Sequence, residues 1–135
     1  MITNLAHIAL HVTDMEQSLE FYCGLLGLKK AFELHDSQDK PWIVYLKVSG
    51  EQFVELFHNG QGSAASMSNR AGYHHFCFGV DDIFAFTKML HDQGFFLDKS
   101  PGMGKDGNYQ LWIQDPDGVD IELMQLQPDS PQAKA

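Results

Sequence analysis

Four side chains of metal-ligand type recur in the sequence with nearly the same spacing. Glu55 follows His7 by 48 residues, and Glu122 follows His75 by 47 residues. Two imidazole nitrogens and two carboxylates suit a borderline divalent ion such as Ni²⁺, Co²⁺, Zn²⁺, Mn²⁺ or Fe²⁺. In an octahedral site, four protein ligands leave two positions for water or for a chelating substrate. We therefore take these four residues as candidate metal ligands.

Each of these residues has an ordinary structural explanation when it is considered alone. A single histidine on a strand is more often a hydrogen-bonded polar group, and Glu55 between Val54 and Leu56 resembles a solvent-facing residue of a half-buried strand. The repetition favours the metal hypothesis, because clusters of ligand-type side chains mark metal sites and single residues do not.

The spacing recurs because the chain contains an internal repeat. The segment HIALHVTD, which starts at His7, matches HFCFGVDD, which starts at His75, at an offset of 68 residues. The segment FVEL from Phe53 matches DIEL from Asp120 at an offset of 67. Such self-similarity indicates two similar structural modules. Each module has about sixty residues, below the usual size of an independent domain, so we expect the two modules to complete one domain.

Both halves show the same predicted order of a strand, a helix and three strands. Asp14 and Asp82 are in N-cap positions, and Gly27 and Gly94 follow the predicted helices as stop signals. Alternation and turn signals in the first half predict a strand over 5–12, a helix over 15–26 and strands over 31–35, 42–48 and 52–57. In the second half they predict a strand over 73–80, a helix over 83–93 and strands over 95–99, 109–114 and 119–126. The predicted fold class is α+β, built from two βαβββ modules.

We expect a single domain over residues 1–126, with modules at about 3–59 and 73–126. Residues 60–72 are small and polar, which predicts a linker. Residues 127–135 contain two prolines and no apolar pattern, which predicts a flexible, frayed tail.

Strand alternation places the four ligand candidates on matching faces. Successive side chains of a strand point to opposite sides. If Ile8 and Leu10 pack on the helix, His7 points away from it, and the same parity holds for Glu55, His75 and Glu122. If the two helix-free faces curl toward each other, the four side chains converge.

Composition excludes several classes of protein. The 135 residues are 44% hydrophobic and 20% charged, which suits one domain with a core and argues against disorder or a coiled coil. Nine basic against eighteen acidic residues give a net charge of −9, which argues against nucleic acid or anionic membranes as partners. The sequence shows no membrane span or signal peptide and only two cysteines, so we expect a cytoplasmic location.

Four segments carry a family resemblance. HIALHVTDMEQSLEFYCGLLGLKK, QFVELFHNG, HFCFGVDD and DPDGVDIEL resemble the signature segments of the vicinal oxygen chelate superfamily, which includes glyoxalase I, bleomycin-resistance proteins and extradiol dioxygenases. The resemblance covers about residues 4–126. It implies paired βαβββ modules that form a cupped, half-open barrel around a metal ion.

The ligand set points to one branch of this superfamily. Glyoxalase I-like enzymes use His, Glu, His and Glu, which match His7, Glu55, His75 and Glu122, whereas extradiol dioxygenases lack the first glutamate. The resemblance therefore implies a glyoxalase I-like lyase that converts a 2-oxoaldehyde–thiol hemithioacetal into a 2-hydroxyacyl thioester. The short chain resembles the bacterial form that prefers Ni²⁺ or Co²⁺, with Zn²⁺ as the alternative. It also implies a homodimer whose sites are shared between chains.

The resemblance assigns further roles. A carboxylate near the metal moves the proton on the carbon next to a carbonyl; we favour Glu122 as this base, with Glu55 as the alternative. Two expected substrate contacts follow from the resemblance: His11, where such relatives tend to carry an arginine that binds a glutathione carboxylate, and Asn59, which matches a glutathione-contacting position. Independently of the resemblance, the glycine-rich loop over residues 102–107 offers Lys105 as a cationic substrate contact, although such a loop is equally typical of a mobile hairpin. The expected cosubstrate is glutathione or another thiol.

Two other functions remain open at this point. One is a metal-dependent epimerase or isomerase of the same superfamily, which uses the same enolate chemistry. The other is a non-catalytic drug-binding resistance protein whose negative charge attracts a cationic drug. The four intact ligand positions favour an enzyme.

Overall fold

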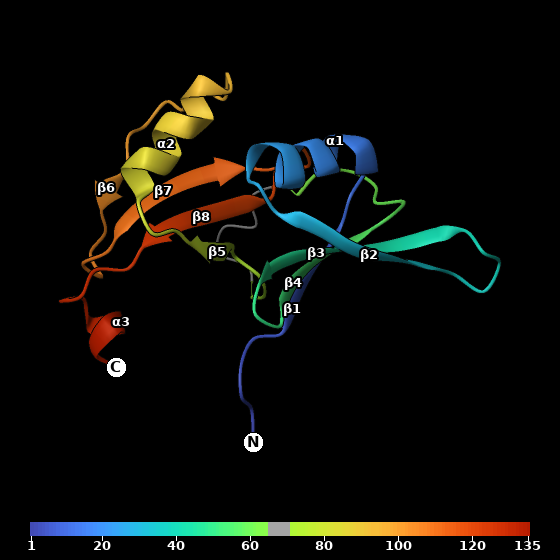
Figure 1. The fold of residues 1–135 in the computed structure, drawn as a ribbon, viewed down its shortest axis with the longest axis horizontal. Helices are drawn as coiled ribbons and strands as arrows, with labels where there is room; N and C mark the ends of the chain where they lie inside the picture. The colour runs from blue at the N-terminus through green and yellow to red at the C-terminus, as the bar shows by residue number, and fades with distance from the viewer. Residues whose placement is uncertain (65–70) are drawn as a thin grey trace. The chain divides into compact units, whose positions relative to one another are not determined.

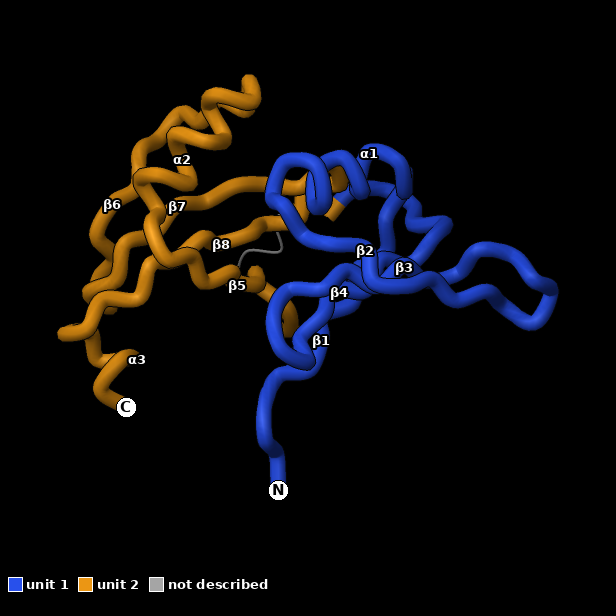
Figure 2. Tube along the Cα trace, viewed as in Figure 1, with its two compact units in different colours: residues 1–63 blue, residues 64–135 orange. Residues whose placement is uncertain are grey.

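The computed structural model describes residues 1–64 and 71–135, so part of the predicted linker lies outside the described residues. The chain divides into two compact units, residues 1–63 and 64–135 (Figure 2). Each unit contains a four-stranded sheet and a helical segment in the predicted βαβββ order, and the α+β fold class is confirmed. Within the described residues, no helix combines the length and the apolar character needed to cross a membrane.

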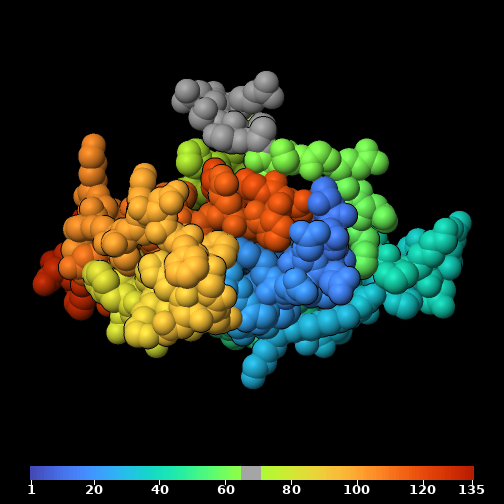
Figure 3. All heavy atoms as spheres, turned by 90° about the horizontal axis from the view of Figure 1, so that it is seen from above, coloured from blue at the N-terminus to red at the C-terminus, as the bar shows by residue number. Residues whose placement is uncertain are grey.

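The first unit is a mixed sheet with the strand order β1-β4-β3-β2. β1 runs parallel to β4, and the other pairs are antiparallel. The β2–β3 hairpin projects beyond the rest of this unit (Figures 1 and 3). Its elements are β1 (His7–His11), α1 (Met15–Leu19), η1 (Glu20–Leu25), β2 (Lys29–His35), β3 (Pro41–Ser49) and β4 (Gln52–Phe57).

The predicted first helix changes its hydrogen-bond pattern halfway. It begins as expected, since the Asp14 carboxylate accepts a hydrogen bond from the Gln17 backbone N–H at 3.1 Å. From Glu20 onward it is a π-helix, in which the Leu26 N–H donates to the Phe21 carbonyl, five residues earlier, at 2.9 Å. The aromatic neighbours Phe21 and Tyr22 are both buried, with their rings edge to face at 5.1 Å.

Gly60, just after β4, lies against the backbone at the end of β1. Its N–H donates to the Val12 carbonyl at 2.9 Å, and a Cβ at this position would lie 2.9 Å from the Val12 carbonyl carbon and oxygen. Because these are backbone atoms, they cannot rotate away. We expect Gly60→Ala to lower the free energy of unfolding by about 1–3 kcal/mol, as measured by urea denaturation.

Gly24→Ala is the matched control for this substitution. A Cβ at Gly24 would meet no described atom within 4 Å, and its backbone is not left-handed. Alanine there should leave stability unchanged or raise it by up to about 1 kcal/mol. Equal losses for the two variants would show that the contact with Val12 is not the cause.

The second unit repeats the arrangement with the strand order β5-β8-β7-β6, and β5 runs parallel to β8. Asp82 caps α2 by accepting hydrogen bonds from the backbone N–H groups of Phe84 at 3.1 Å and Ala85 at 2.9 Å. α2 packs against β7 and β8. The elements are β5 (Phe76–Gly79), α2 (Ile83–Asp92), β6 (Gly102–Met103), β7 (Tyr109–Gln114), β8 (Asp120–Gln125) and α3 (Pro131–Lys134).

The predicted strand over 95–99 is wrong. The edge strand is instead the two-residue β6, which pairs with Tyr109 and Gln110 of β7. Residues 95–100 form no ladder and line a cavity of about 780 Å³ together with residues 110–114. An apolar run such as Phe95-Phe96-Leu97 forms a strand only where it can pair and pack, and here Phe96 is 80% exposed.

The last residues of the chain contain a short helix that the sequence did not predict. Residues 131–134 form α3, which is capped by the buried Ser130. Asn108 is fully buried; its amide donates to Gln132 Oε1 at 3.2 Å, and its Oδ1 accepts from the Gln127 N–H at 2.9 Å. These partners are nineteen or more residues apart along the chain, so no local pattern revealed them.

Candidate functional site

In the first unit, the sheet brings His7 and Glu55 together. β1 and β4 are adjacent parallel strands in which His7 pairs with Phe53 and Ala9 pairs with Glu55. His7 Nδ1 lies 3.4 Å from Glu55 Oε1. Along β1 the burial alternates as parity predicts, with Ile8 and Leu10 more buried than the residues beside them. We call the side of this sheet that carries His7 and Glu55 the histidine face.

Tyr45 is a third residue at this pair that the sequence analysis missed. It lies on β3 directly opposite Glu55, and its hydroxyl donates a hydrogen bond to the Glu55 carboxylate. Burial, together with this carboxylate, raises the pKa of Tyr45. The sequence did not reveal this residue, because its position opposite Glu55 can be recognised only when the register of β3 against β4 is known.

In the second unit, His75 and Glu122 form the equivalent pair. His75 lies one residue before β5, and its Nε2 is 3.1 Å from Glu122 Oε2. Trp112 lies opposite Glu122 on β7, and its ring meets the His75 ring at 4.6 Å. His75 Nδ1 lies 2.7 Å from His74 Nδ1, so one of these nitrogens carries the hydrogen and the other accepts it. The contact with His74 fixes the orientation of the His75 ring, as hydrogen bonds to the second ring nitrogen do in metal-binding histidines.

Cys77 contacts the carboxylate of the second pair. It lies opposite Glu122 in the β5–β8 register, where Ala9 stands in the first unit. Burial and the negative charge of Glu122 raise the pKa of Cys77 to about 12. The thiol is therefore protonated at neutral pH; its S–H donates to the Phe78 carbonyl oxygen, 3.7 Å from Sγ, and the Glu122 carboxylate lies close by.

The two carboxylates suit a cation. Glu55 is 7% exposed and Glu122 is 8% exposed, and among the described residues neither has a lysine or arginine ion-pair partner. A buried carboxylate without a cation is costly, so the nitrogen and oxygen donors present here fit a divalent ion. In residues 1–64 and 71–135, however, no three ligand-type side chains cluster closely enough to hold a metal. Each unit provides two of the four expected ligands.

The predicted substrate contacts are divided between the units. His11 ends β1 on the histidine face, with its ring 5.3 Å from Phe57. Asn59 is exposed just after β4, with a left-handed φ of 66°. The structure thus places both in the first unit with His7, whereas Lys105 lies in the turn between β6 and β7 of the second unit.

Comparisons with known proteins agree with this architecture. A family model described as "Glyoxalase/Bleomycin resistance protein/Dioxygenase superfamily" matches residues 4–123. The chain is 33% identical over 129 residues to a probable lactoylglutathione lyase of Synechocystis sp., covering 90% of this chain and 94% of that protein. It is 30% identical over 125 residues to a probable lactoylglutathione lyase of Vibrio cholerae, covering 90% and 89%.

The structural similarity extends over the same length. The solved structure of a glyoxalase family protein from Enterococcus faecalis superposes with a TM-score of 0.76 at 24% identity, covering 90% of this chain and 97% of that one. The fold, the repeated units and the match over most of the sequence lead to one conclusion. The chain belongs to the glyoxalase/bleomycin resistance protein/dioxygenase superfamily.

Proposed function

We propose that the protein is a metal-dependent glyoxalase I-like lyase, which converts the hemithioacetal of a 2-oxoaldehyde and a thiol into a 2-hydroxyacyl thioester. The observation that carries this proposal is the pair of His–Glu contacts at equivalent positions, each with a buried carboxylate that has no lysine or arginine partner among the described residues. The relatives named as lactoylglutathione lyases support the same reaction.

His7, Glu55, His75 and Glu122 would hold one divalent ion, with Ni²⁺ or Co²⁺ favoured and Zn²⁺ as the alternative. When bound, such an ion stabilises negative charge on the two oxygens of an enediolate. We place the active form as a homodimer whose sites draw ligands from both chains. The two cysteines are free thiols, which supports a cytoplasmic location.

Within this site we assign Glu122 as the base. Glu55 accepts a hydrogen bond from the Tyr45 hydroxyl, whereas the residue opposite Glu122 is Cys77, whose S–H donates to the Phe78 carbonyl. Each carboxylate also lies beside its histidine, so the difference between them is the hydroxyl donor that Glu55 has and Glu122 lacks, which favours Glu122 as the base. Its carboxylate removes the proton from the carbon next to the carbonyl and returns it to the neighbouring carbon. Its burial keeps bulk water away from the transferred proton.

The reaction can be tested directly. Metal-free protein is reloaded separately with Ni²⁺, Co²⁺ and Zn²⁺ and incubated with methylglyoxal and either glutathione or another thiol, and the thioester is followed by its absorbance. We expect thioester formation that is lost on chelation and restored by adding metal. Absence of thioester with every metal and thiol would reject the lyase, and metal-dependent isomerisation of an acyl-CoA would favour the isomerase instead.

A further inference from the structure

The histidine face carries two lysines directly opposite each other. Lys29 on β2 pairs with Lys47 on β3, Lys47 pairs with Phe53 on β4, and Phe53 pairs with His7 on β1. Directly paired residues of neighbouring strands point to the same side of a sheet. His7, Phe53, Lys47 and Lys29 therefore form one row across the histidine face.

Considered by itself, this row of side chains lowers the stability of the fold. Like charges directly opposite each other destabilise a sheet, and among the described residues neither Lys29 nor Lys47 has an ion-pair partner, although the chain has eighteen acidic residues. The neighbouring Lys30 differs, since it pairs with Leu46 on the other side of the sheet and forms an ion pair with Glu33 at 2.5 Å. Local conflicts of this kind are expected at functional sites.

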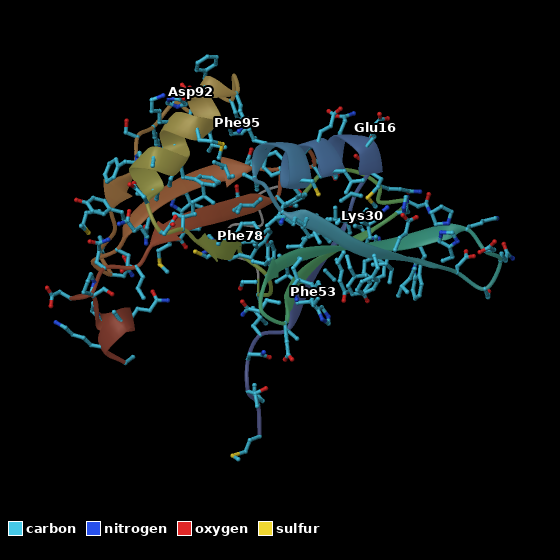
Figure 4. All side chains as sticks on the ribbon, viewed as in Figure 1. Glu16, Lys30, Phe53, Phe78, Asp92 and Phe95 are labelled. Carbon is cyan, nitrogen blue, oxygen red and sulfur yellow. The ribbon has the colours of Figure 1, made fainter. Side chains whose placement is uncertain are left out.

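The surroundings of Lys47 resemble a binding surface with an apolar floor and a cationic end. Lys47 is half-buried, and its Nζ lies 4.4 Å from the centre of the Phe53 ring. Phe53 lies on the side of the sheet away from α1 (Figure 4). The Tyr45 ring lies 6.1 Å from Phe53 and stacks on Phe32 at 4.2 Å.

The row also lies at a useful distance from the candidate ligands. Adjacent strands are about 4.8 Å apart, so two strand spacings place the Lys47 backbone about 10 Å from that of His7. A ligand held at His7 and Glu55 by one end could therefore reach Lys47 with a carboxylate at the other end. The lysine side chain shortens this span further.

On the basis of the proposed lyase function, we propose that Lys47, with Lys29 beside it, binds a carboxylate of the thiol cosubstrate. The lysines would then supply the positive charge that relatives tend to provide with an arginine at the position of His11. The chemical class of the ligand is a peptide-like thiol with at least one free carboxylate, which lies along the aromatic floor formed by Phe32, Tyr45 and Phe53.

The test uses a probe that binds without reacting. S-methylglutathione keeps both carboxylates but has no free thiol, and its diethyl ester has the same skeleton without the negative charges. Affinities for both are measured by calorimetry with the metal-loaded wild type, Lys47→Gln and Lys29→Gln. Lys40→Gln is the matched control, because Lys40 is exposed on the β2–β3 hairpin, has no ion pair among the described residues, and its loss changes the net charge equally.

We expect the wild type to bind the acid at least tenfold more tightly than the ester. Lys47→Gln should weaken binding of the acid by about 10-fold to 100-fold, as expected for a charged hydrogen bond, and leave binding of the ester unchanged. Unchanged ester binding also shows that the variant is folded. Lys29→Gln should have the same effect to a smaller extent, and Lys40→Gln should have none. In turnover, Lys47→Gln should raise KM for the thiol and leave kcat close to wild type.

The proposal is overturned if the wild type does not prefer the acid, or if Lys47→Gln and Lys40→Gln bind it alike. These outcomes are independent of turnover. A wild type that binds the acid through Lys47 but forms no thioester rejects the lyase function and retains the carboxylate site. An active enzyme whose thiol KM is insensitive to Lys47→Gln rejects the carboxylate site and retains the lyase.

Discussion

We expect Glu122→Gln to lower kcat of the metal-saturated enzyme by about 10²-fold to 10⁴-fold, the range that general acid–base catalysis contributes. The amide has nearly the same shape as the carboxylate but cannot take a proton from carbon. Substrate binding should change less, because the thiol contacts proposed above lie on residues of the first unit. The measurement is thioester formation under saturating methylglyoxal and thiol.

Two matched variants separate the base from a ligand and from general charge effects. Glu55→Gln should weaken metal affinity, measured by titration of the metal-free protein, and should keep more turnover than Glu122→Gln once metal is saturating. Glu51→Gln, on the exposed turn between β3 and β4, should change neither quantity. If metal-saturated Glu122→Gln stays within tenfold of wild type, the proton is moved by another group.

Unfolding and refolding His7→Ala and His75→Ala together should restore about a quarter of wild-type activity, although each variant alone should be inactive. The reason is the symmetry of a dimer whose sites take one His–Glu pair from each chain. Random pairing makes about half of the dimers mixed. Each mixed dimer has one site with both lesions and one site with none, so about a quarter of all sites are intact.

The recovery depends on exchange between chains, which gives the experiment its controls. The two variants mixed without unfolding should stay inactive as long as the dimers do not exchange. Different affinity tags on the two variants allow the mixed dimers to be isolated before the assay. Isolated mixed dimers without activity would place all four ligands on a single chain and reject the shared site.

The local features of the fold followed from the sequence. The alternating strands over 52–57 and 109–114 are found at the predicted residues, and both predicted N-caps, Asp14 and Asp82, are in place. The spacing of the internal repeat was also sufficient to identify the residues of the two His–Glu contacts. These predictions succeeded because side-chain alternation, capping and tight turns depend on residues close together in the chain.

Other features depend on contacts between residues far apart in the chain. The absence of a strand over 95–99 and the order of the tail around Asn108 depend on what each segment packs against. The hydroxyl of Tyr45 became part of the site only through the register of β3 against β4. Propensity cannot decide such cases, because a segment of ambiguous preference adopts the structure that its distant neighbours stabilise.

The lysine row shows most clearly what only the tertiary structure decided. Regular alternation along β2 would place Lys29 and Phe32 on opposite faces, because they are three positions apart. The strand contains a register shift between Lys30 and Phe32, so Lys29 lies opposite Lys47 and Phe32 lies opposite Tyr45, all on the histidine face. A bulge adds one residue to a strand and reverses the parity of every residue beyond it. The sequence therefore determined which residues are available for chemistry, and the cross-strand register decided which of them share a surface.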